Sequence, residues 1–68
     1  MKEKITFREY VLPTKDPQTG VEERGEYLGS FKKTFVGASV SEINDQIVAF
    51  LKKHAEENQV DVRVWQGQ

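Results

Sequence analysis

The chain has 68 residues, of which 37% are hydrophobic and 31% are charged, and its formal net charge is −1. This length allows one small domain with a thin core, and the near-zero net charge argues against a general polyanion binder. Because the sequence contains no cysteine, it excludes disulfide bonds and thiolate metal ligands. It also lacks an apolar run of about 18 residues and a signal-peptide pattern. We therefore expect a single cytoplasmic domain over residues 1–68, without a membrane segment.

A long β-hairpin over residues 4–36 is predicted for the N-terminal half of the chain. Residues 4–12 alternate between an apolar face, which includes Phe7, and a polar face, which is typical of a half-buried strand. Residues 26–36 form a second strand-like run. The aromatic residues expected on the buried face of this run are Tyr27, Phe31 and Phe35.

The sequence Asp16-Pro17-Gln18-Thr19-Gly20 predicts the turn between these two strands. Aspartate suits the first position of a type I turn and proline the second, while Gly20 can take the left-handed conformation that closes the loop. This D-P-x-T-G turn is similar to the hairpin turn of phage-integrase arm-binding domains, which read DNA with a small sheet. The similarity covers the turn alone. This chain adds a strand after its helix and is acidic where those domains are basic, so the turn assigns it to no family.

Counting outward from the turn predicts the pairing of the two hairpin strands. Phe7 is expected opposite Gly29, where the glycine leaves room for the aromatic ring. In the same register Glu9 lies opposite Tyr27. Gly25 is the candidate position for a β-bulge.

A helix is predicted over residues 39–57. The sequence Ser39-Val40-Ser41-Glu42 is a capping box, with Ser39 as the N-cap and the Glu42 carboxylate reaching back to the Ser39 amide. An apolar stripe follows at helical spacing. Its residues are Ile43, Ile47, Phe50, Leu51 and His54.

The last predicted element is a strand over residues 60–65, in which valines alternate with the outward residues Asp61, Arg63 and Trp65. We therefore predict an α+β fold of order ββαβ. The three strands form an antiparallel sheet in the order 2-1-3, with the helix packed on one face. The other face of the sheet stays open.

Catalytic and metal chemistry have little support in the sequence. His54 is the single histidine, and no motif supplies it with a nucleophile, although Glu57 lies one helical turn further on. We interpret His54 as a half-buried structural residue near the helix C-terminus. No glycine pattern of a phosphate loop and no cluster of acidic ligands is present. We expect no enzyme, no cofactor and no metal site.

Two candidate binding surfaces remain. The open sheet face combines cations with large aromatic residues. Such a face can contact another protein, stack on the bases of single-stranded nucleic acid, or remain solvated without a partner. Its candidate residues are Arg8, Tyr10, Lys32, Thr34, Arg63 and Trp65. The distal part of the hairpin is either a protein-contacting arm or a mobile connection. Its candidate residues are Val11, Leu12, Glu22 and Glu23.

These observations favour a small non-enzymatic protein-interaction module that acts as an accessory or regulatory factor. Its expected partner is another protein or a second copy of the chain, bound through the open face, the hairpin arm or both. The alternative is a nucleic-acid-binding module that uses the aromatic and basic residues of the open face. We place this alternative second because the acidic residues of the arm would repel a nucleic acid.

Overall fold

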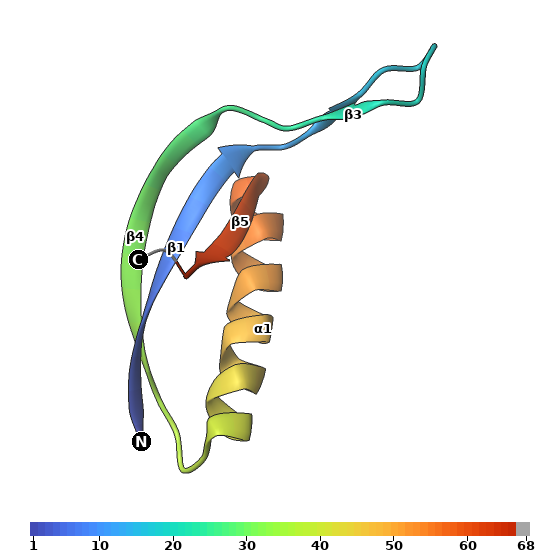
Figure 1. Ribbon diagram of the computed structural model, residues 1–68. Helices are drawn as coiled ribbons and strands as arrows, with labels where there is room; N and C mark the ends of the chain where they lie inside the picture. Colours follow the sequence, from blue (N-terminus) through green and yellow to red (C-terminus); the bar gives the residue numbers. More distant parts are fainter. Residues whose placement is uncertain (67–68) are drawn as a thin grey trace.

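The computed structural model describes residues 1–66, in which one helix packs on one face of a three-stranded antiparallel sheet (Figure 1). The strands of this sheet lie in the order β4-β1-β5. Their bounds are Lys2–Val11 for β1, Tyr27–Val36 for β4 and Val60–Trp65 for β5. The predicted α+β fold and strand order are therefore confirmed. Residues 67–68, which the predicted domain includes, lie outside the described residues.

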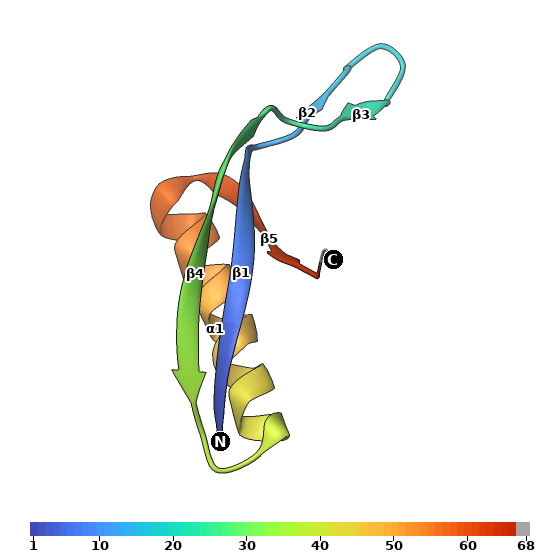
Figure 2. The same cartoon turned by 60° about the vertical axis from the view of Figure 1, so that its left-hand side comes forward.

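The hairpin is interrupted near its middle and continues as a thin arm, here defined as residues 12–24 (Figure 2). In the arm, β2 (Thr14–Lys15) pairs with β3 (Glu22–Glu23) as a separate two-stranded sheet. The radius of gyration is 14.3 Å, against about 11 Å for a compact domain of this length. The difference reflects the arm, which extends away from the helix and the main sheet.

The predicted turn at the tip of the arm is confirmed. The Asp16 carboxylate accepts a hydrogen bond from the Gln18 amide at 2.8 Å, and Gly20 has a φ of 73°. Two backbone bonds close the loop: the Gly20 amide donates to the Asp16 carbonyl at 2.8 Å, and the Asp16 amide donates to the Val21 carbonyl at 2.9 Å. Asp16 therefore lies opposite Val21 rather than Gly20, and this difference moves the strand register by one residue.

The register between β1 and β4 differs from the predicted one by two residues. Phe7 pairs with Phe31 rather than with Gly29, and Glu9 pairs with Gly29 rather than with Tyr27. The position of Asp16 opposite Val21 accounts for one residue of this shift. A bulge accounts for the other, because Tyr10 pairs with Tyr27 and Leu28 is left as an extra residue in β4.

The bulge also changes the face on which Tyr27 lies. Because side chains alternate along a strand, one extra residue moves Tyr27 from the helix side to the side of Tyr10. The prediction of Tyr27 on the buried face is therefore wrong, and so is the bulge at Gly25. Gly25 instead allows a close backbone approach, since a Cβ there would overlap the carbonyl oxygen of Val11.

The helix α1 spans Val40–Asn58, and its predicted N-cap is confirmed. The Ser39 hydroxyl accepts a hydrogen bond from the Glu42 amide at 3.2 Å. The Glu42 carboxylate accepts from the Ala38 amide at 2.8 Å, one residue before the expected donor. The helix ends at Gln59, which takes a left-handed conformation with a φ of 52° and donates its amide to the Ala55 carbonyl.

The core lies between α1 and the sheet and is largely aromatic. Its buried residues are Phe7, Phe35, Ile43 and Val62. Phe7 is fully buried, with its ring centre 5.0 Å from that of Phe50 and 5.2 Å from that of Phe31. Because side chains alternate along a strand, packing of this core against α1 turns the other side chains of β1 and β5 toward solvent. These solvent-facing side chains form part of the candidate binding surface.

Candidate functional site

The open face is the side of β1, β4 and β5 that points away from α1 (Figure 1). Alternation from the buried residues Phe7, Phe35 and Val62 determines which side chains it carries. Its residues are Lys2, Lys4, Thr6, Arg8, Tyr10, Tyr27, Ser30, Lys32, Thr34, Val36, Asp61, Arg63 and Trp65.

Charge is distributed unevenly between the two sides of the fold. Across the three strands, five cations of the open face accompany one carboxylate, that of Asp61, which gives a formal charge of +4. The chain as a whole has a net charge of −1. The acidic residues of β1, Glu3 and Glu9, lie on the helix side. The open face is thus a local basic surface on a slightly acidic protein.

A stack of three side chains crosses the sheet at the centre of the open face. The guanidinium carbon of Arg8, on β1, lies 3.3 Å from the ring centre of Trp65, on β5. The same carbon lies 5.5 Å from the ring centre of Tyr27, on β4. Tyr27 in turn packs on Tyr10, with ring centres 5.6 Å apart. One cation is therefore flanked by aromatic rings from both neighbouring strands.

The two arginines of the open face differ in their polar partners. Arg63 lies opposite Arg8 in the sheet, and its guanidinium contacts the Asp61 carboxylate at 3.1 Å through Nη2 and at 3.2 Å through Nε. Arg8 forms no salt bridge with any carboxylate of residues 1–66 and donates no hydrogen bond to a side chain there. Its charge is held by aromatic contacts alone.

The structure brings together four of the six residues predicted for the open face, namely Arg8, Tyr10, Arg63 and Trp65. The other two lie further along β4: Lys32 pairs with Thr6, and Thr34 pairs with Lys4.

Lys2, Lys4 and Tyr27 are among the residues of this surface that were not predicted from the sequence. The positions of Lys2 and Lys4 on this surface could have been predicted by extending the alternation of β1 side chains toward the N-terminus. Tyr27 depends on the bulge, and the only local signal for it is Gly29 in the middle of a strand, where φ is 150°.

The candidate residues of the arm do not form one site. Val11 still pairs with Val60 in the main sheet, and Leu12 follows it, with exposed fractions of 42% and 47%. Glu22 and Glu23 lie further out, opposite Lys15 and Thr14. Where the arm meets β5 there is a shallow depression of about 210 Å³. It is lined by Pro13, Glu22, Arg24, Asp61 and Arg63.

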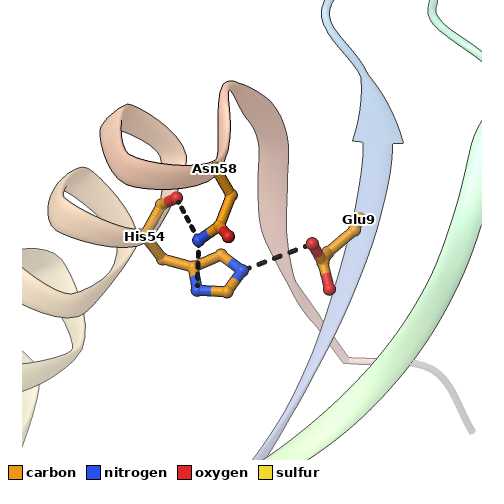
Figure 3. A network of polar contacts seen from close by, with 3 residues as sticks. All are labelled: Glu9, His54 and Asn58. Atoms are coloured by element: carbon orange, nitrogen blue, oxygen red, sulfur yellow. Dashed lines mark hydrogen bonds and ion pairs between the residues drawn. The ribbon is translucent and has the colours of Figure 1, made fainter.

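His54 belongs to a separate polar cluster between the end of α1 and β1 (Figure 3). Its Nε2 atom lies 3.3 Å from the Glu9 carboxylate, and the Asn58 amide nitrogen lies 3.4 Å from its Nδ1 and donates to its carbonyl at 3.0 Å. The imidazole also packs on Phe50 and Phe31, with ring centres 5.2 Å apart in both pairs. These contacts supply a carboxylate and an amide but no nucleophile.

The carboxylate beside His54 comes from the sheet and not from the helix. Glu57, which is one turn away in sequence, instead lies 3.9 Å from the Lys53 ammonium. The Glu9 and His54 side chains are 27% and 22% exposed. The geometry favours a link that ties the last turn of α1 to the centre of the sheet, in keeping with the structural interpretation of His54.

Comparisons with known proteins assign no family to this surface. No protein-family model matches the chain, and neither the curated proteins nor the solved structures contain a significant match. Within residues 1–66, no three side chains of His, Asp or Glu gather as metal ligands. In the same part of the chain, no helix combines the length and the apolar character needed to cross a membrane.

Proposed function

We propose that this chain is a small non-enzymatic module that binds another protein through its open face, as an accessory or regulatory factor. The observation that carries the proposal is the composition of the central stack. Trp65, Arg8 and Tyr27 belong to the three residue types that contribute most binding energy at protein interfaces. Trp65 and Tyr27 are also 43% and 51% exposed, so their rings are available to a partner.

The surroundings of the stack resemble the rim of an interface. Lys2 and Lys4 of the open face lie toward the start of β1, and Lys32 lies on β4, on the far side of Thr6 from Trp65. Protein interfaces concentrate aromatic residues and arginine at the centre and leave lysine at the solvated rim. The arrangement thus supports a contact whose energy comes from the stack, with the lysines setting orientation and the rate of encounter.

The charge of the open face indicates the kind of partner. A formal charge of +4 complements an acidic surface. Two copies joined symmetrically through this face would set equal positive charges against each other. A different, acidic protein therefore fits better than a second copy of the chain. The cytoplasmic location expected from the sequence remains a prediction.

Single-stranded nucleic acid is the second candidate, because cations interleaved with aromatic rings on an open sheet suit stacking and phosphate contacts. Two features rank it lower. Arg8 already occupies a face of the Trp65 ring on which a base would stack. Glu22 of the arm lines the same depression as Asp61 and Arg63, so two carboxylates at this end of the open face repel phosphates.

The test is a chemical-shift map on the isotope-labelled full chain. A partner is first isolated by cross-linking and purified, and is then titrated into the chain while backbone amides are followed. The proposal predicts shifts concentrated in β1, β4 and β5, with the exposed face of α1 unaffected. Shifts confined to α1 would contradict it. Salt-sensitive, micromolar binding of an oligonucleotide at the open face would favour the second candidate instead.

A further inference from the structure

We infer that Arg8 is a preset receptor for a carboxylate of the partner. This inference rests on the proposed function, since it names the group that the open face would recognise. A guanidinium binds a carboxylate through two parallel N–H···O contacts when its planar fork is free and correctly oriented. Arg8 meets both conditions.

The orientation of the Arg8 fork is constrained by the stack. The guanidinium carbon lies 3.3 Å from the Trp65 ring centre, a distance at which the flat face of the group rests on the ring. Tyr27 borders the group from the neighbouring strand at 5.5 Å. Because the N–H donors of a guanidinium lie in its plane, contact through the flat face leaves them free for a further ligand. The stack therefore reduces the entropy that a flexible arginine loses on binding.

The donors of Arg8 also lack an acceptor within residues 1–66. Arg63 is a useful comparison, because it lies on the same face and directly opposite in the sheet. Its fork contacts the Asp61 carboxylate through two nitrogen atoms. Arg63 and Asp61 therefore already form an arginine–carboxylate contact beside the stack. Arg8 has the N–H donors for a second contact of this kind, but residues 1–66 supply no carboxylate to accept it.

A carboxylate fits this position better than the phosphate of a nucleic acid. A nucleic acid strand would bring several phosphates past the carboxylates of Asp61 and Glu22, which line the depression where the arm meets β5. Repulsion would act on each phosphate. A single acidic side chain of a protein partner meets Arg8 alone and can place its other groups toward the lysines of the open face.

The experiment uses the full chain and three probes. One is the peptide Glu-Gly-Glu-Gly-Glu, acetylated and amidated. The second replaces each glutamate by glutamine, and the third is an oligothymidylate of about eight nucleotides. Binding is followed by Trp65 fluorescence and by the NMR signal of the Arg8 Nε–H group. We expect the glutamate peptide to shift both signals, while the glutamine peptide leaves them unchanged.

Two variants separate the receptor from general charge attraction. Arg8→Lys keeps the charge but loses the planar fork, so we expect it to weaken peptide binding by about tenfold or more. Arg24→Lys is the matched control, and we expect it to bind within about twofold of the parent because Arg24 is an exposed residue of the arm, outside the open face. The amide spectrum of each variant verifies its fold.

The possible outcomes distinguish the inference from the proposed function. Equal peptide binding by the parent chain and Arg8→Lys would overturn the role of Arg8 while leaving a protein-binding open face intact. Binding of the oligonucleotide alone would overturn both. If no probe shifts the Arg8 signal even at millimolar concentration, Arg8 is not a carboxylate receptor, and the proposed function is then judged by the partner titration.

Discussion

Tyr27 packs against Tyr10 across the sheet, with ring centres 5.6 Å apart, because Leu28 is an extra residue in β4. Without this bulge, Tyr27 would point toward α1 and the open face would lose one of the two rings that flank Arg8. A single local irregularity thus determines the composition of the candidate site.

The bulge predicts the effect of a substitution at Gly29. This residue has a φ of 150°, which side-chain-bearing residues rarely adopt. Gly29→Ala should lower the free energy of unfolding by about 1–3 kcal/mol, although open space surrounds the position. Urea unfolding measures this change, with Ser30→Ala as the neighbouring exposed control. Equal stability of the two variants would mean that the bulge does not require glycine.

Much of the fold could be predicted because its elements rest on local patterns. Alternation placed β5, and the capping box placed the start of α1 at Ser39. The strand register could not be predicted in this way. It depends on the position of Asp16 opposite Val21 and on the extra Leu28, and each moves the pairing by one residue. Packing of Phe7 and Phe31 under the helix selects this register over its neighbours.

The candidate site could be predicted in composition but not in arrangement. Alternation identified Arg8 and Trp65 as residues of one face, yet their stacking across β1 and β5 is a tertiary contact. The basic character of the face was hidden for a similar reason. A net charge of −1 gives no indication that the cations and carboxylates of β1 separate onto opposite sides.

Gly25 is predicted to be essential at the base of the arm. An alanine Cβ there would overlap the Val11 carbonyl, where the Val11 amide donates to the Glu26 carbonyl at 2.8 Å. Gly25→Ala should separate the strands at this point and cost at least about 1–3 kcal/mol. Faster hydrogen exchange of the Val11 amide would report the separation. Unchanged exchange would show that the backbone accommodates the methyl group.

The N-cap of α1 gives a prediction for Ser39. Ser39→Ala removes the acceptor of the Glu42 amide and should reduce stability by about 0.5–2 kcal/mol. In a domain of this size the loss should appear as a lower melting temperature. Ser41→Ala, within the first turn and exposed, is the matched control. If the melting temperature falls for Ser41→Ala and not for Ser39→Ala, the helix is not capped by Ser39.

His54 is predicted to stabilise the fold without taking part in binding. His54→Gln keeps a polar group near Glu9 but loses the ring contacts with Phe50 and Phe31, so we expect a loss of about 0.5–1 kcal/mol. Partner affinity should stay within about twofold of the parent chain. Loss of binding with an intact amide spectrum would assign His54 a functional role.

The central claim is that the open face binds a partner through its aromatic stack, and the affinity of the Trp65→Ala variant tests it most directly. Val48→Ala is the control, because Val48 is 65% exposed on α1, on the opposite side of the fold. Isothermal titration with the purified partner should show a loss of about 2 kcal/mol or more for Trp65→Ala, as at an interface hot spot, and almost none for Val48→Ala. Equal affinity of Trp65→Ala and the parent chain would contradict the claim.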